Sequence, residues 1–352
     1  MTAATPSDQP DDLQVRNDLA IGQWLIVCAA MVLAMIVIGG ITRLTESGLS
    51  IIYWRPLTGF LPPLSEAAWQ QAFEAYRTSP QYLQVNAGMT MAEFRTIFWW
   101  EYIHRAWGRL IGLVFFLPFV WFLIRGRIRP DLVPRLILLF LLGGAQGALG
   151  WYMVRSGLVD VPEVSQYRLA AHLSLAFLIY AALAWTGLSL ISPVQPVAAG
   201  RVATRILRLA VLVLILVALT ILSGAFVAGT DAGLIFNTFP LMEGALLPPG
   251  YFEHASAPFE DHGTIQFHHR VLALISLIAV ALLWWQSRWL ALAPRARMVA
   301  NSLMVMALLQ VALGITTLIL VVPVHAAACH QTGAVLLFTL LLWFLHDLRG
   351  TA

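Results

Sequence analysis

Four of the nine histidines lie inside apolar stretches that are long enough to cross a membrane. An imidazole in lipid without a partner is costly, so a histidine there usually has a task. Two neutral imidazoles from facing helices can bind an iron macrocycle from both sides, whereas zinc usually takes four protein ligands, or three and a water. The sequence therefore predicts two pairs of iron ligands, His104 with His172 and His269 with His330.

The alternative for each of these four residues is a hydrogen-bonded histidine of the core. A single histidine in such a place is more often a core residue than a ligand. Four of them at matched positions in a chain that repeats itself favour ligands instead. The remaining five histidines are assigned to surface or loop positions. They are His254, His262, His268, His325 and His346.

One acidic residue accompanies the first pair. Glu101 precedes His104 by three residues, so both lie on one helix face. The equivalent residue before His269 is Gln266, which cannot ionise. A carboxyl group at this place suits proton transfer, although the helix dipole also favours a glutamate near a helix N-terminus. The difference between Glu101 and Gln266 favours a catalytic role for Glu101, with one reactive and one supporting site.

Three arginines also fall inside the apolar stretches, namely Arg105, Arg109 and Arg270. A guanidinium group is well shaped to bind a carboxylate, so these residues are candidates for binding the propionates of a porphyrin. They can equally brace the helices or bind lipid phosphate. The sequence leaves these alternatives open.

The elements that must position these residues are membrane helices. Of the 352 residues, 59% are apolar and 11% are charged, against roughly a quarter charged in a soluble domain. This composition excludes a disordered or soluble globular chain, and a net charge of +3 gives no reason to expect nucleic acid. We predict an all-α polytopic membrane protein with eight spans. They lie near 21–41, 97–124, 133–154, 170–192, 206–228, 265–287, 299–321 and 328–346.

The arginines predict the orientation of these spans. Arginine clusters at 125–135, 201–208 and 288–297 flank one side, which places both termini in the cytoplasm. Every even-numbered span then runs inward and carries its predicted ligand in its first turns, so all four ligands lie near the periplasmic face. The acidic start of the chain does not resemble a cleaved signal or transit peptide, which favours a bacterial inner membrane.

The two halves of the chain resemble each other. Gly39 matches Gly224, Thr45 matches Thr230, and Gly59 matches Gly244, all at one constant spacing. Further along the chain, Gln146 and Gly150 match Gln310 and Gly314. Each half has four spans, and an even number of crossings lets the second half begin on the same side of the membrane as the first. The two repeats are therefore parallel. We predict two tandem, pseudo-symmetric four-helix bundles, at 21–195 and 196–352, after a cytoplasmic leader at 1–20.

These motifs together resemble one family. The segments "EYIHRAWGR", "AAHLSLA", "GTDAGLIFNTFP", "FHHR" and "CHQTGA" are similar to those of the heme A synthases. That family of membrane enzymes converts heme O to heme A for cytochrome oxidase assembly. The resemblance extends over about residues 39–333.

The resemblance implies a division of labour between the halves. His104 and His172 would hold heme O, the substrate, and heme A, the product, with Glu101 as the catalytic residue. His269 and His330 would hold a heme b that passes electrons. The reaction would oxidise one ring methyl group of heme O to a formyl group through successive hydroxylations. Expected partners are heme O synthase, an unidentified electron acceptor and the lipid bilayer, and a homo-oligomer is left open.

The chain departs from some family members in one respect. Those members carry a cysteine pair in the first outer segment, where this chain has none. Cys28 and Cys329 lie toward opposite ends of their spans, which is too far apart for a disulfide. The chain therefore resembles the alphaproteobacterial and mitochondrial subgroup.

Two other functions remain as alternatives. A di-heme electron-transfer protein of the b-cytochrome type explains the four histidines equally well, but it gives no reason for the difference between Glu101 and Gln266. A transporter ranks last, because its polar residues tend to lie at the midplane rather than near one face.

Overall fold

The computed structural model describes residues 10–54, 59–159, 162, 164–192, 200–254 and 257–349. Within these ranges every regular element is a helix, and eight helices are long and apolar enough to cross a membrane. This confirms the predicted class and the predicted spans. They are α1 (Pro10–Leu44), α4 (Met91–Ile124), α5 (Val133–Gly157), α6 (Gln166–Ile191), α7 (Arg201–Gly229), α9 (His262–Ser287), α10 (Pro294–Ile319) and α11 (Val324–Leu348).

Several helices are longer than hydropathy predicted, and α4 shows the physical reason. It begins at Met91, before the apolar run, because Thr90 and Glu93 form a capping box. Glu93 Oε2 accepts from the Thr90 amide at 2.7 Å, and Thr90 Oγ1 accepts from the Glu93 amide at 3.4 Å. This pair satisfies free amides of the first turn and lets the helix start in polar sequence.

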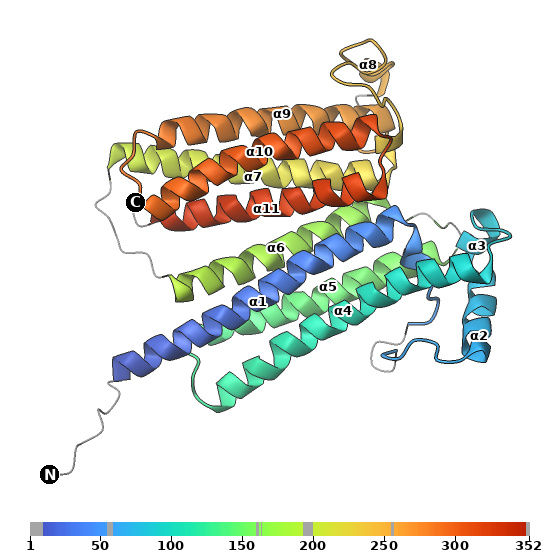
Figure 1. Ribbon diagram of the computed structural model, residues 1–352, viewed down its shortest axis with the longest axis horizontal. Helices are drawn as coiled ribbons and strands as arrows, with labels where there is room; N and C mark the ends of the chain where they lie inside the picture. Colours follow the sequence, from blue (N-terminus) through green and yellow to red (C-terminus); the bar gives the residue numbers. More distant parts are fainter. Residues whose placement is uncertain are drawn as a thin grey trace.

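The helices lie in two groups that follow the chain order (Figure 1). Helices α1, α4, α5 and α6 lie together, and α7, α9, α10 and α11 form the second group. The groups meet through α1, α6, α7 and α11. Tyr180 and Thr339 share a hydrogen bond of 2.6 Å across this junction, and Gln331 Nε2 donates to the Ile36 carbonyl at 2.8 Å. The predicted boundary at 195/196, and residues 1–9 of the predicted leader, lie outside the described residues.

The start of α1 and the end of α11 lie at the same end of the molecule, and the short elements gather at the opposite end (Figure 1). These short elements occupy the two long segments between α1 and α4 and between α7 and α9, called the outer segments. They are η1 (Ser47–Leu49), α2 (Glu66–Arg77), α3 (Pro80–Gln84), η2 (Ala232–Leu234) and α8 (Tyr251–His254). An aromatic cluster packs α2 onto the extended start of α4, with the rings of Trp69 and Phe98 4.9 Å apart. The outer segments therefore stand close to the helix ends that carry the predicted ligands.

Candidate functional site

Each predicted histidine ligand packs against a glycine of a neighbouring helix. A Cβ atom added to that glycine would lie only 2.8 to 3.1 Å from the Cε1 atom of the imidazole. Since real Cβ contacts are rarely so short, any larger residue would push the ring away. The four contacts join His104 of α4 to Gly39 of α1, His172 of α6 to Gly150 of α5, His269 of α9 to Gly224 of α7, and His330 of α11 to Gly314 of α10.

The sequence marked all four of these glycines as repeat positions, but their role was missed. The two halves preserve each glycine together with its histidine, which marks the positions in the sequence but not their role. The structure adds the reason, which is that the helix backbone must come within contact distance of the imidazole.

The second pair of histidines has the spacing of two ligands on one metal. The ring centres of His269 and His330 lie 6.5 Å apart, with the ring planes at 89°. An imidazole nitrogen lies about 2 Å from a metal that it binds, so two rings on opposite sides of one metal have centres roughly 6 Å apart. The pair therefore fits a metal held between the rings, as a heme iron would be.

Ser223 fixes the tautomer of His269. Its Oγ atom donates to the Thr220 carbonyl at 2.8 Å, and it therefore accepts from Nδ1 of His269, also at 2.8 Å. This arrangement keeps the proton on Nδ1 and leaves Nε2 with a free lone pair, which is the form that binds a metal.

Two matched glutamines hold the other histidine of each pair. Gln146 Nε2 donates to the His172 carbonyl at 3.0 Å and lies 3.3 Å from Nε2 of the ring. Gln310 Nε2 donates to the His330 carbonyl at 2.9 Å and lies 3.1 Å from Nδ1. The glutamines were noticed as repeat positions, and the structure shows that they orient the imidazoles.

The first pair has ring nitrogens without partners. The Nδ1 atoms of His104 and His172 are both buried, and neither has a hydrogen-bond partner among the residues that the structure describes. Buried polar atoms are normally paired, so such atoms point to a bound group. The first pair therefore also fits a ligand between α4 and α6.

The structure places Glu101 at the joint between α4 and the outer segment. Its side chain is buried, with the residue 2% exposed. One carboxylate oxygen accepts from the Ser50 hydroxyl and from the Ile51 amide, both at 2.7 Å. The other accepts from Arg105 Nη2 at 2.5 Å. Glu101 thus ties the segment after η1 to the helix that carries His104.

Gln266 makes the equivalent joint in the second half, but it faces different backbone groups. Its Nε2 atom donates to the carbonyls of Ala232 (2.8 Å) and Ile235 (2.5 Å), and its Oε1 atom accepts from Arg270 at 2.8 Å. A carboxylate meets donors in the first half, whereas an amide meets acceptors in the second. The Glu/Gln difference therefore has a structural basis in addition to the catalytic one that the sequence suggested.

Two of the three intramembrane arginines brace the same joints. Arg105 donates to the carbonyls of Ile51 (2.8 Å) and Tyr53 (3.3 Å), and Arg270 donates to those of Phe236 (2.6 Å) and Thr238 (2.9 Å). The guanidinium of Arg109 lies 5.4 Å from the ring centre of Phe60. The bracing alternative is thus observed for Arg105 and Arg270, and propionate binding stays a prediction for all three.

The surface assignment of His346 is wrong. The residue is 0% exposed and its ring lies against Trp185, with the centres 5.6 Å apart. The cause is that α11 packs into the junction between the helix groups, which buries a side chain that hydropathy placed at a helix end. His262 and His325 are exposed as expected, and His268 contacts Tyr251 Oη at 3.1 Å.

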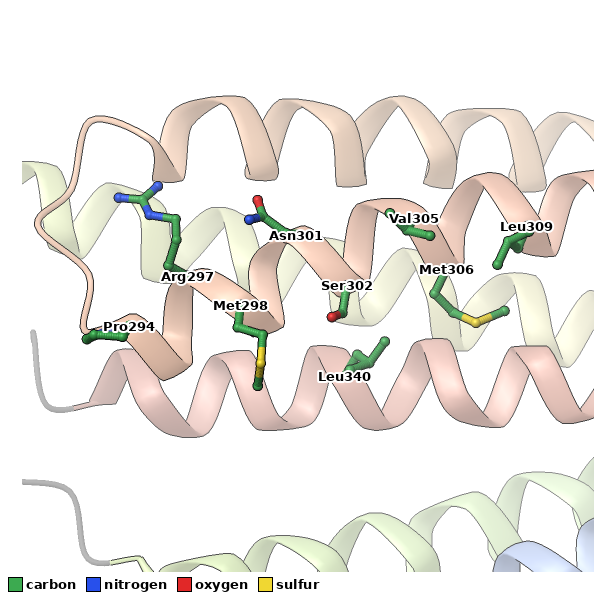
Figure 2. Close-up of a pocket in the computed structure, with 9 residues that line it drawn as sticks. All are labelled: Pro294, Arg297, Met298, Asn301, Ser302, Val305, Met306, Leu309 and Leu340. Atoms are coloured by element: carbon green, nitrogen blue, oxygen red, sulfur yellow. The ribbon is translucent and has the colours of Figure 1, made fainter.

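Figure 2 shows a groove on α10 that is lined by none of these residues. It runs along the helix from Pro294 to Leu309, with Leu340 of α11 beside it. Its lining contains none of the predicted ligands, nor Glu101 or the intramembrane arginines.

Comparison with known proteins agrees with these features. Residues 22–342 match the family described as cytochrome oxidase assembly protein, COX15-CtaA. The chain is 51% identical to the heme A synthase of Parvibaculum lavamentivorans, over 94% of this chain and 95% of the relative. It is 49% identical to the heme A synthase of Nitrosospira multiformis, over 99% and 98%, and 46% identical to heme A synthase COX15 of Arabidopsis thaliana, over 94% and 74%.

Proposed function

Because the chain belongs to the COX15-CtaA family of cytochrome oxidase assembly proteins, we propose that it acts as a heme A synthase. It is a multi-pass membrane oxidoreductase that converts the ring methyl group of heme O to the formyl group of heme A. The observation that carries this function is similarity near 50% identity over almost the whole chain. The matched region includes both histidine pairs.

The two histidine pairs are assigned to two hemes. We place heme O between His104 and His172, and a resident heme b between His269 and His330. The buried, unpartnered ring nitrogens of the first pair and the 6.5 Å ring spacing of the second support this assignment. When bound, the heme iron supplies the redox chemistry. The chain itself supplies the glycines that make room for the histidine imidazoles. It also supplies the polar side chains that orient these imidazoles.

Glu101 is proposed as the catalytic residue. Its carboxylate is buried and lies less than one helical turn from His104, which supports a role in holding or moving a proton beside the substrate. Arg105, Arg109 and Arg270 are proposed to bind propionates. The Nε atom of Arg270 supports this, because it is buried and has no hydrogen-bond partner in the described part of the chain.

The proposed topology places both termini in the cytoplasm of a bacterium and the hemes toward the periplasm. Arginines at the end where α1 begins support it, since Arg129 pairs with Asp18 at 3.1 Å and Arg295 pairs with Asp347 at 2.6 Å. Heme O synthase and an electron acceptor are the proposed partners, and a homo-oligomer stays open. A di-heme electron-transfer protein would explain the histidines but not the similarity to heme A synthases.

Pigment analysis tests the function directly. The protein is purified from cells that make heme O, and its pigments are extracted and separated. Heme O, heme A or partly oxidised intermediates should accompany heme B. Heme B alone would contradict the enzyme and support the electron-transfer alternative.

A further inference from the structure

Four glycines of α4 and α5 in the first half have open space beside their backbones. A Cβ atom added at Gly112 of α4, or at Gly143, Gly144 or Gly147 of α5, would meet no atom within 4 Å. All four glycines are exposed. This contrasts with Gly150, further along α5, where an added Cβ would lie 3.0 Å from His172.

The aromatic contacts show that two of these glycines face each other. The rings of Phe116 (α4) and Phe140 (α5) lie 5.3 Å apart, so these residues mark the facing sides of the two helices. Gly112 stands four residues before Phe116, and Gly144 stands four residues after Phe140. Since the helices run in opposite directions, both steps lead one turn toward the periplasmic side. Gly112 and Gly144 therefore lie on the facing sides of the two helices, one turn to the periplasmic side of the phenylalanine pair, with open space beside each of them.

The opening is bounded on both sides and leads toward the first histidine pair. Phe116 and Phe140 close its inner side, and the rings of Trp54 and Trp151, 6.4 Å apart, stand at its outer side. Gly144 lies about 9 Å along the helix from Gly150, which touches His172. At the periplasmic side of the opening are the buried ring nitrogens that have no partner in the described part of the chain.

The second half carries larger side chains at the same positions. Pairing His104 with His269 and Gly150 with Gly314 sets Gly112 opposite Leu277 and Gly144 opposite Leu308. Gly143 corresponds to Ala307, which is only 3% exposed. The two halves therefore differ at this helix pair, with an opening beside the proposed substrate heme and leucines beside the proposed resident heme.

We propose that the gap between α4 and α5 is a lateral opening that receives the isoprenoid chain of heme O from the bilayer. This inference rests on the proposed function, which makes heme O the ligand of the first pair. Heme O carries a long apolar chain that heme B lacks, and such a chain gains free energy by leaving water for an apolar channel. A substrate must also enter and a product leave, whereas the resident heme needs no such passage.

A cysteine in the opening tests the position of the chain. Gly144→Cys is made in a Cys329→Ser background, because Cys329 is exposed while Cys28 is buried. The purified protein is alkylated with N-ethylmaleimide alone, with heme O or with heme B. Heme O should slow alkylation about tenfold, as expected for a thiol covered by a bound ligand, and heme B should slow it far less. Equal rates with heme O and without heme, or equal protection by both hemes, would overturn the proposal.

Filling the opening gives a second readout. The double variant Gly112→Leu with Gly144→Leu copies the leucines of the second half. The control Ala145→Leu places one leucine at a neighbouring exposed position on another side of α5. The double variant should purify with the ratio of heme O plus heme A to heme B lowered about tenfold, since overpacking typically has effects of this size. The control should keep the wild-type ratio. An unchanged ratio in the double variant would refute the opening.

These outcomes are separable from the fate of the proposed function. If heme O protects the Gly144→Cys variant from alkylation but the wild-type protein forms no heme A, the opening stands and the enzymatic function fails. If heme A forms normally while heme O gives no protection, the function stands and the opening fails.

Discussion

At the residue scale, the site depends on what stands next to each imidazole. The four histidines could be singled out as candidate ligands from sequence because histidine is unusual in an apolar span and because each recurs in the other half. The contact glycines and the orienting glutamines could not be assigned a role, because apolar helices contain many glycines and only packing shows which of them touch a ring. The joint made by Glu101 could not be predicted either, since its partners at Ser50 and Ile51 lie far away in the sequence.

Gly314→Ala tests the close contact between helix and imidazole. The added methyl group would lie 2.8 Å from Cε1 of His330, so the ring must move. We expect heme binding to the second pair to weaken by about 1 to 3 kcal/mol, as for other overpacked sites. The heme content of the purified variant measures this. Gly200→Ala is the control, because its methyl group meets no atom within 4 Å; equal heme content in the two variants would disprove the contact.

Glu101→Gln separates the charge of this residue from its shape. We expect the variant to keep its hemes but to form no heme A, because the carboxylate that pairs with Arg105 and is proposed to handle protons has gone. Extracted pigments measure both properties. Heme A formed at the wild-type rate would show that Glu101 has only its structural role.

Gln266→Glu is the reverse exchange and tests the structural role alone. The new carboxylate would face the carbonyls of Ala232 and Ile235 without a proton to donate. An unpaired buried acceptor typically costs about 1 to 3 kcal/mol. A lower thermal midpoint than that of the wild-type protein is therefore expected, measured in the same detergent. An unchanged midpoint would mean that this amide does not stabilise the joint.

At the element scale, hydropathy predicted all eight spans but not where the helices begin. The start of α4 is set by a cap and by the aromatic residues of α2, and neither carries a hydropathy signal. The outer segments lie outside the predicted spans and carry no such signal either. Their short helices are fixed by distant contacts, such as Gln81 Nε2 donating to the Glu46 carbonyl at 2.7 Å, which sequence spacing does not reveal.

Thr90→Ala tests the cap that begins α4. Loss of the capping hydroxyl should destabilise the first turns by about 1 kcal/mol. Hydrogen exchange of the amides in Phe94 and its neighbours should accelerate, while exchange deep in the span stays as it is. Thr96→Ala is a matched control, since Thr96 lies in the same helix but outside the cap. Similar exchange in both variants would argue that tertiary packing, rather than the cap, holds this end.

At the scale of the whole molecule, the two helix groups repeat the same sequence motifs but differ in the residues that surround their histidines. The repeat was visible in the sequence because glycines, glutamines and histidines recur in order. The differences that matter are local: Glu101 against Gln266, and open glycines against leucines. Contacts such as that between Arg43 and Asp231, at 2.9 Å, and that between Tyr180 and Thr339 hold the groups together. Such contacts between halves have no signature in either half alone.

Counting hemes tests the central claim most directly. The purified protein is loaded with heme, and heme per chain is measured by the Soret absorbance and by iron content for the wild type, His104→Ala and His269→Ala. Two hemes per wild-type chain are predicted, because each imidazole pair is proposed to bind one heme iron, and each variant should lose the heme of its own half. A colourless wild-type protein, or variants that both retain the full heme content, would contradict the account.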